Sequence, residues 1–371
     1  MKFNKFALSE LATIKYGKNQ KKVLSESGNI PIYGTGGLMG YATTALYDKP
    51  SVLIGRKGTI GKVKYVEQPF WTVDTLFYTI INTDLVIPKY LFYVMSLIDL
   101  NNYNEGTTIP SLRTETLNRL EFDIPNLEEQ RKILSCLNPI DEKIELNNAI
   151  NNNLLEQVLA IYRHHFVDTT NELRQTCRAD EYFDISIGKT PPRKEPQWFS
   201  TNPKDVTWVS ISDMGTCGLY ISESSEQLTR KAIDRHNVKI VPDNTVLLSF
   251  KLTVGRIAIT DGEMTTNEAI AHFKTDKKEI NEYLYCYLKC FNYQTMGSTS
   301  SIATAVNSKI IKGMPFVVPT DEEITEFHSL AAPMFAKIKA NQAEIRNLTS
   351  LRDTLLPKLM SGELDVSGID L

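Results

Sequence analysis

Residues 137–161 read LNPIDEKIELNNAINNNLLEQVLAI. Apolar or asparagine side chains recur along this stretch at alternating steps of three and four residues, and these positions are Leu137, Ile140, Ile144, Asn147, Asn151, Leu154, Val158 and Ile161. A repeat of this kind places one stripe of side chains along a helix and is typical of a coiled-coil seam. The stretch therefore predicts a long helix that packs against a second helix.

The second helix is encoded 194 residues later in the same chain. FDIPNLEEQ (122–130) resembles FVVPTDEEI (316–324), and the shift of 194 (316 − 122) continues without a gap through the helical segments. The seam of the second copy comprises Ala331, Met334, Ile338, Asn341, Ile345 and Leu348, after which Arg352 occupies the next position. One constant shift over several matches indicates an internal duplication.

Asn147 and Asn341 occupy the same seam position in the two copies. A buried asparagine lowers the stability of a seam but fixes the register of the paired helices, so we expect the two long helices to pair with each other. The alternative is two asparagines on a solvated face. Pro139 and Pro333 stand near the start of each seam, and proline is tolerated in the first turn of a helix. We therefore predict a short helix, a break and then a long helix in each copy.

The rest of the chain consists of two similar modules. Short apolar or β-branched runs, such as SVLI, LFYTII and TVLLSF, alternate there with Gly, Pro, Asn and Ser, which predicts a compact α+β fold. SVLIGRKGTIGKV (51–63) matches TVLLSFKLTVGRI (245–257) at a shift of 194, whereas TIKYGK (13–18) matches DISIGK (184–189) at 171. The change of shift indicates insertions within the modules. The predicted order is a first module over 1–125, a helical segment over 126–166, a second module over 167–319 and a helical segment over 320–371.

Composition limits the classes of protein to consider. The chain has 371 residues, a formal net charge of −3 and five cysteines without a CxxC pair, so it predicts neither a zinc site nor a disulfide framework. No apolar run approaches the roughly 20 residues that span a membrane, and the first residues lack the apolar core of a signal peptide. We expect a cytoplasmic protein that does not contact a membrane.

The glycine-rich stretch YGTGGLMG (33–40) raises the question of a nucleotide site. Its glycines do not have the G-x-G-x-x-G spacing between a strand and a helix, and GRKGT (55–59) lacks the phosphate-loop spacing. The sequence also contains no pattern of Ser, His and Asp that would indicate a catalytic site. Two alternatives remain for the glycine-rich stretch: a structural turn, or a loop whose backbone N–H groups and Thr35 approach a phosphate backbone.

Four stretches carry a family resemblance. They are IPIYGTGGLMGYATTALYDKPSVLIGRKGTIGKV (30–63), IPNLEEQRKIL (124–134), WVSISDM (208–214) and LLPKLMSGEL (355–364). Together with the duplicated architecture, they make the chain resemble the specificity (S) subunit of type I restriction–modification enzymes over essentially its whole length.

This resemblance implies an α+β fold with two target recognition domains separated by two long helices that form an antiparallel coiled coil, with pseudo-twofold symmetry. Each domain would read one half of a split double-stranded DNA sequence. The helices would dock two methyltransferase subunits, which use S-adenosylmethionine to methylate adenine, and restriction subunits, which use ATP and Mg²⁺, would join the complex. The chain itself would carry no catalytic residues and no cofactor or metal.

The residues agree with that expectation. Two similar modules related by a twofold axis suit two half-sites on opposite strands, which lie roughly 34–36 Å apart when one helical turn separates them. The stretch from Pro139 to His165 would form a helix of roughly 40 Å, which is a suitable spacer.

GRKGTIGK (55–62) is the strongest candidate for a DNA-contacting loop, because Arg can read guanine with two hydrogen bonds and Lys neutralises phosphate. The alternative is a solvated hairpin tip. The second copy reads SFKLTVGR (249–256) and has lost both Gly55 and Gly58, which makes the loop shape there uncertain. YGKNQKK (16–22), GKTPPRK (188–194), EGTTIPSLR (105–113) and MGSTSSIAT (296–304) have the same basic or hydroxyl-rich character.

The residues predicted to contact DNA are Lys18, Asn19, Lys21, Lys22, Tyr33, Thr35, Arg56, Lys57, Thr59, Lys62, Thr107, Thr108, Ser111, Arg113, Lys189, Thr190, Arg193, Lys194, Ser210, Lys251, Arg256, Ser298, Thr299 and Ser301. The sequence pI of about 6.0 is unusual for a DNA-binding protein, so we expect the isolated chain to bind DNA weakly and a partner methyltransferase to complete the DNA clamp. The alternative function is a coiled-coil scaffold that binds protein and has no DNA specificity.

Overall fold

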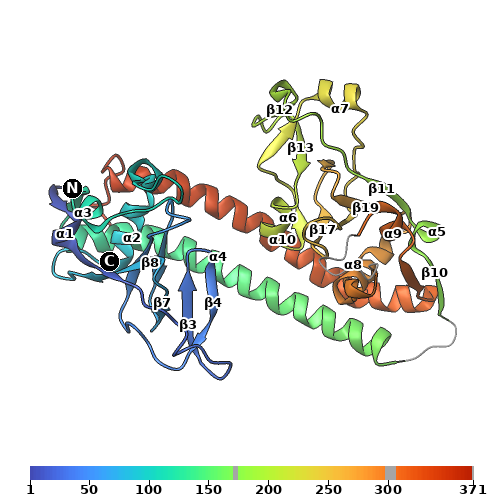
Figure 1. Ribbon diagram of the computed structural model, residues 1–371, viewed down its shortest axis with the longest axis horizontal. Coiled ribbons are helices and arrows are strands. Elements are labelled where there is room, and N and C mark those ends of the chain that lie inside the picture. Colours follow the sequence, from blue (N-terminus) through green and yellow to red (C-terminus); the bar gives the residue numbers. More distant parts are fainter. Residues whose placement is uncertain (170–173, 297–305, 370–371) are drawn as a thin grey trace. The chain divides into compact units, whose positions relative to one another are not determined.

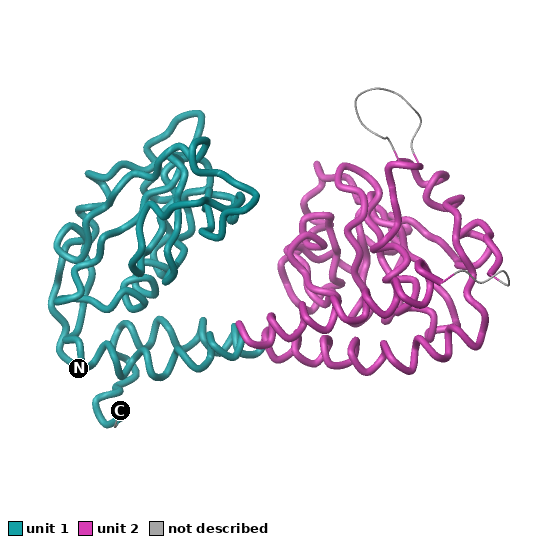
Figure 2. Tube along the Cα trace, turned by 90° about the horizontal axis from the view of Figure 1, so that it is seen from below, with its two compact units in different colours: residues 1–144, 347–371 teal, residues 145–346 magenta. Residues whose placement is uncertain are grey.

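The computed structural model describes residues 1–169, 174–296 and 306–369. The chain divides into two compact units, Met1–Ile144 with Asn347–Leu371 and Glu145–Arg346, which Figure 2 draws in different colours. Two long helices, α4 (Leu127–Tyr162) and α10 (Asp321–Met360), each contribute one segment to either unit (Figure 1).

The two long helices pack together in antiparallel orientation within each unit. In the second unit, the Asn147 amide donates a hydrogen bond to Glu344 Oε2 (2.9 Å), and the Asn341 amide donates one to Asn151 Oδ1 (2.8 Å). Residue numbers thus fall along α10 as they rise along α4. The predicted pairing of the helices is confirmed, and every seam residue is buried or half-buried. Asn147 and Asn341 are both 1% exposed, so the solvated alternative is wrong.

The predicted break in each helical segment is wrong, because α4 and α10 are continuous and Pro139 and Pro333 lie inside them. A proline removes one backbone hydrogen bond, to the carbonyl of the residue four positions earlier, and costs about 3 kcal/mol in a helix interior. Both prolines lie on exposed faces, as do Ser135 and Ser329 four positions earlier, so water can hydrate the carbonyls that lose a partner. Apolar burial beside each proline offsets the cost, since Leu137 and Ala331 are fully buried.

The described part of the first unit contains three sheets. The strands are paired in the orders β1 (Phe3–Ala7)–β9 (Glu121–Pro125); β2 (Ala12–Tyr16)–β8 (Leu76–Ile81)–β5 (Ser51–Gly55)–β6 (Val63–Val66); and β4 (Gly37–Ala42)–β3 (Ile30–Gly34)–β7 (Trp71–Thr72). The short helices are α1 (Leu8–Leu11), α2 (Pro88–Ser96) and α3 (Thr114–Asn118), with a 3₁₀ turn at Leu100–Tyr103. Their core includes Phe77 and Phe122 together with Leu137 of α4 and Leu359 of α10.

The second unit repeats this plan. Its strands are paired in the orders β10 (Gln175–Arg178)–β20 (Pro315–Val318); β11 (Asp184–Ile187)–β19 (Ile270–Lys274)–β16 (Val246–Ser249)–β17 (Ile257–Thr260)–β14 (Tyr220–Ile221); and β12 (Phe199–Ser200)–β15 (Glu226–Leu228)–β13 (Val206–Val209)–β18 (Thr265–Thr266). The helices are α5 (Ala179–Tyr182), α6 (Asp213–Thr216), α7 (Arg230–His236), α8 (Asn281–Cys290) and α9 (Ser308–Lys312), with 3₁₀ turns at Pro196–Trp198, Lys278–Ile280 and Tyr293–Met296 and a π turn at Arg163–Val167. None of the helices in the described part of the chain is long and apolar enough to cross a membrane.

The duplication is preserved in the strand register. Ile14 of β2 pairs with Thr79 of β8, and Ile185 of β11 pairs with Phe273 of β19. The two shifts seen in the sequence therefore meet in one sheet, since 185 − 14 = 171 and 273 − 79 = 194. The second module thus accommodates 23 additional residues (194 − 171) without changing this pairing.

Each module closes on itself through its outermost strands. Phe6 of β1 pairs with Phe122 of β9, and Cys177 of β10 pairs with Phe316 of β20, at the same two shifts. Both ends of a module therefore lie side by side where the following long helix begins.

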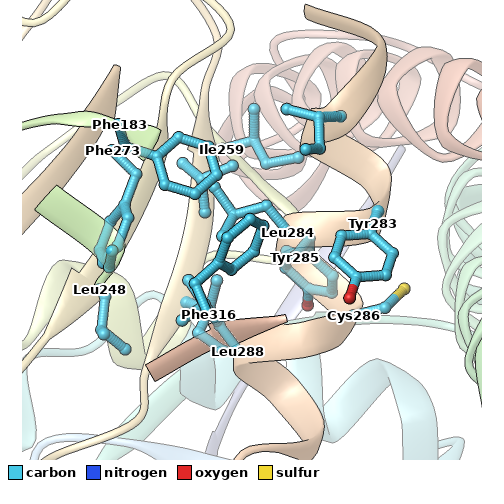
Figure 3. Packing of buried hydrophobic residues seen from close by; sticks show 14 of the residues in the cluster. Phe183, Leu248, Ile259, Phe273, Tyr283, Leu284, Tyr285, Cys286, Leu288 and Phe316 are labelled. Atoms are coloured by element: carbon cyan, nitrogen blue, oxygen red, sulfur yellow. The ribbon is translucent and has the colours of Figure 1, made fainter. Parts of the chain in front are cut away.

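The core of the second unit is aromatic (Figure 3). Phe183 and Phe316 pack edge to face with ring centroids 4.8 Å apart, and Phe316 also contacts Tyr283 of α8. Phe273 of β19 joins them, so the sheet, α8 and the closing strand β20 share one cluster. Replacing such a buried Phe by Ala costs about 3–5 kcal/mol.

His272 is a buried titratable group on β19 of the second unit. Its ring nitrogens lie 3.0 Å from Ser186 Oγ and 2.7 Å from Thr266 Oγ1. Burial, with a smaller contribution from Lys274, lowers the pKa of His272 to about 3. The native state therefore holds the neutral imidazole, whereas the unfolded chain binds the proton near pH 6.5.

We expect His272 to make the second unit sensitive to acid. A lowered native pKa contributes stability that is complete above pH 6.5 and is lost as the pH falls towards 3, with a slope of up to about 1.4 kcal/mol per pH unit. Thermal unfolding of the wild type and of His272→Gln between pH 4.5 and 7.5 measures this, and the variant should show the flatter dependence. His164→Gln, at an exposed position, is the control. Equal slopes for wild type and His272→Gln would contradict the assignment.

We expect replacement of both buried asparagines by isoleucine to raise the melting temperature by about 2–4 °C, because apolar side chains add burial to the seam. Each substitution removes one hydrogen bond, but the gain should come mainly from Asn341→Ile, since Asn341 donates to the neutral Asn151 amide whereas Asn147 donates to the Glu344 carboxylate, which forms the stronger bond. Asn148→Ile, on the exposed face of α4, is the matched control and should change little. Differential scanning calorimetry tests this, and a fall would mean that the amide hydrogen bonds contribute more than apolar burial would.

Candidate nucleic-acid interface

The predicted residues of the first module lie on segments that leave the ends of strands. These segments are the turn after β2 (17–22), the β3–β4 hairpin, the loop after β5 (56–62) and the loop before α3 (105–113). Hairpins and loops of this kind project from a sheet and leave their side chains accessible.

Three of these segments meet around Gly58. Its N–H donates a hydrogen bond to the Pro110 carbonyl (2.9 Å), and Lys57 forms a β-bridge with Ser111. Thr35 Oγ1 lies 3.9 Å from the position that a Cβ would take on Gly58. The backbone at Gly58 is left-handed, with φ of +86°, which explains why glycine occupies the turn.

Backbone hydrogen bonds to the segment 72–75 link the same loops. The Lys18 N–H donates to the Thr72 carbonyl (2.8 Å), the Val73 N–H to Tyr33 (3.0 Å) and the Arg56 N–H to Thr75 (2.9 Å). The structure thus brings together the loops that carry Lys18, Thr35, Lys57 and Ser111.

The side chains of two residues predicted to contact DNA instead make contacts within the first module. Arg56 Nη1 donates to the Asp74 carbonyl (2.8 Å), and its guanidinium lies 5.0 Å from the ring centroid of Tyr16. Tyr33 is buried, and Lys64 Nζ lies 4.0 Å from its ring centroid.

Other predicted side chains of the first module are solvent-exposed. Arg113 is paired with Glu105 (3.1 Å), an ion pair that contributes at most about 1 kcal/mol at the surface. The other exposed positions are Lys18, Asn19, Lys21, Lys22, Lys57, Thr59, Lys62, Thr107 and Thr108. These are suited to contact an anionic ligand.

The second module repeats the backbone contacts with different side chains. The Lys189 N–H donates to the Thr266 carbonyl (2.9 Å), which is the counterpart of Lys18 and Thr72. Thr190 donates its hydroxyl hydrogen to Glu268. Burial alone would raise the pKa of Glu268, but the Thr190 hydrogen bond and the nearby cations Lys251 and Arg193 lower it. Thr190 therefore contacts this carboxylate directly, whereas Lys251 and Arg193 favour its charged form electrostatically.

Several predicted side chains of the second module have partners within the chain. Lys189 Nζ donates to the His236 carbonyl (2.6 Å). Arg193 is paired with Glu226 (2.8 Å), and its guanidinium lies 4.2 Å from the ring centroid of Phe199. Lys194 is exposed.

The side chains of Ser210 and Arg256 both bond to the segment 211–213 of the second unit. Ser210 Oγ donates to Asp213 Oδ2 (2.6 Å), and Arg256 Nη1 donates to the Ile211 carbonyl (2.5 Å). Arg256 and Asp213 line a cavity of about 830 Å³ that Gln342 of α10 also lines. Ser298, Thr299 and Ser301 lie outside the described residues.

Sequence reasoning missed Leu252. The 194-residue shift aligns it with Gly58, and its backbone is also left-handed, with φ of +60°. The loop therefore keeps its turn although the glycine is lost. The left-handed conformation costs a leucine about 1–2 kcal/mol, and the Leu252 side chain is 100% exposed. The alignment itself could have revealed the residue, because it places a leucine where a turn requires positive φ.

Comparison with known proteins identifies the family. A family model described as the type I restriction modification DNA specificity domain matches residues 1–156 and 172–345. The MjaIX specificity subunit of Methanocaldococcus jannaschii is 27% identical over 357 residues, which cover 87% of this chain and 80% of that protein. The HindI specificity subunit of Haemophilus influenzae is 23% identical over 365 residues, which cover 76% of this chain and 79% of that protein.

A solved structure shares the fold. The crystal structure of the type I restriction–modification system S subunit from M. genitalium aligns over 97% of this chain and 96% of that one, with a TM-score of 0.55 and 17% identity. The match of the family model to most of the chain assigns the function beyond this likeness of fold. The chain belongs to the type I restriction–modification specificity (S) subunits, which recognise the DNA target within the complex and are themselves non-catalytic.

Proposed function

We propose that the chain reads a split DNA target in which each module contacts one half-site. The observation that carries the proposal is the shared strand register, which brings Lys57 and Lys251 to the same loop of two related modules. The side chains around these two lysines differ, as expected when each module reads a different sequence. Backbone amides, hydroxyls and lysines supply phosphate contacts, and the divergent side chains supply base contacts.

The long helices would act as the spacer between half-sites. We retain the division into modules at 1–125 and 167–319 and helical segments at 126–166 and 320–371. The 36 residues of α4 correspond to about 54 Å of helix, which exceeds the roughly 34–36 Å between half-sites one turn apart.

In this proposal the chain works inside a cytoplasmic complex with DNA. Two methyltransferase subunits would methylate adenine with S-adenosylmethionine, and restriction subunits would use ATP and Mg²⁺. Cofactors in such systems belong to the partner subunits. The net charge of −3 supports a division of labour in which a partner provides part of the positive DNA-binding surface.

A methylome tests the proposal. We expect co-expression of this chain with its methyltransferase, in a host without adenine methylation, to produce one split motif with methyladenine on both strands. Single-molecule sequencing of the host DNA reads the motif and the gap directly. A host that carries the methyltransferase alone is the control.

An absence of methylation would have two explanations, which a measurement of DNA binding by the complex distinguishes. A stable complex that binds no DNA sequence selectively would favour the coiled-coil scaffold. A stable complex that binds a split sequence without methylating it would locate the defect in the partner.

We expect Lys57→Gln and Lys251→Gln to weaken DNA binding by the complex on all sequences alike. Each exposed lysine that contacts a phosphate adds about 0.9 to the slope of log affinity against log salt, so each variant should lower the slope by that amount. Fluorescence anisotropy at several salt concentrations measures the slope. Lys5→Gln is the control, because the Lys5 ammonium lies 3.5 Å from Asp123 on the strand pair β1–β9. A loss confined to one base position would identify the lysine as a base reader instead.

A further inference from the structure

Leu252 combines two unfavourable features at one position. Its backbone is left-handed, which leucine rarely adopts, and its side chain is 100% exposed to water. Glycine, which Gly58 supplies at the aligned position of the first module, would remove both costs. Outliers of this kind persist where the surrounding structure enforces them and are concentrated at functional positions.

Hydrogen bonds on both sides of Leu252 hold the loop in this shape. The buried Ser249 hydroxyl donates to the Thr253 carbonyl (2.6 Å) and accepts from the Arg256 N–H (3.0 Å). The Gly255 N–H donates to the Ser249 carbonyl (3.0 Å), and Gly255 is itself left-handed, with φ of +91°. The loop therefore presents the leucine from a defined backbone.

The surroundings of Leu252 favour DNA as the group that it contacts. The exposed Lys251 precedes it and the exposed Thr253 follows it. A leucine between an exposed lysine and an exposed threonine is poorly suited to a dry protein interface but well suited to the major groove. The thymine C5-methyl is the apolar group that bases present there.

We propose that Leu252 is a specificity-determining residue whose side chain contacts the methyl group of a thymine in the half-site read by the second module. This inference rests on the proposed function. The first module has no equivalent contact, because Gly58 carries no side chain and Thr35 is its neighbour. The aligned loops of the two modules would then present different side chains to their half-sites.

The first test uses two variants in the methyltransferase complex. Leu252→Gly installs the residue of the first module, and Leu252→Asn introduces a polar side chain that tolerates left-handed backbone. We expect Leu252→Gly to raise the melting temperature by about 2–4 °C while both variants relax the methylated motif at one A·T pair of the second half-site. The first half-site should stay unchanged and acts as the internal control.

The second test removes the thymine methyl. Each thymine of the target is replaced in turn by deoxyuridine, and binding of the complex is measured. Loss of one buried methyl-sized contact weakens binding about fourfold, so the wild type should lose about that factor at one position of the second half-site. Leu252→Gly should bind the unmodified target about fourfold more weakly and show no further loss with deoxyuridine.

The outcomes separate this proposal from the function on which it rests. A wild-type split motif that neither variant changes would overturn the role of Leu252 and leave the DNA-recognition role intact. A relaxed motif with equal sensitivity of wild type and variant to deoxyuridine would also overturn the thymine contact. If the wild-type complex shows no split motif and no sequence-selective binding, both proposals are wrong.

Discussion

The register of two long helices is the constraint on which the rest of the structure depends. Their seams are apolar except at a few positions, and two of those, Asn147 and Asn341, are buried and hydrogen-bonded across the pair. An apolar seam alone would tolerate a slip by one heptad, but a slip here would leave both amides buried without partners. The asparagines thus trade some stability for a single alignment.

The asparagines also reveal how an internal duplication adapts. Asn341 bonds to Asn151, but the position that corresponds to Asn151 in the second copy is Ile345, which cannot accept a hydrogen bond. Asn147 therefore uses Glu344 instead. A similar exchange occurs in the loops. In the first module, Gly55 has no side chain and leaves room for the Thr59 carbonyl. At the aligned position of the second module, the Ser249 hydroxyl donates a hydrogen bond to the Thr253 carbonyl. In both cases the backbone arrangement is the same in the two copies, while the side chains that stabilise it differ.

The sequence was sufficient to predict the features that follow from the spacing of residues along the chain. The seams, the duplication and the loops around Lys57 and Lys251 follow from periodicity and from two constant shifts. The continuity of α4 through Pro139 could not be predicted, because it depends on apolar burial beside the proline. The inward roles of Tyr33 and Arg56 depend on neighbours distant in sequence, such as Lys64 and Asp74. The exposure of Leu252 depends on the conformation of its loop. That conformation could not be predicted, because Gly55 and Gly58 have no glycine counterparts in the second module.

The pairing of the first and last strands of each module has an evolutionary consequence. Because β1 joins β9 and β10 joins β20, each module enters and leaves the chain at nearly the same point. The helical seam tolerates a change in length between those strands, since the second module already carries 23 more residues (194 − 171) than the first without a gap in the seam. Recombination at the two closing strands of a module would exchange the whole module in one event and leave the contacts between the two long helices, such as Asn341 to Asn151, in place.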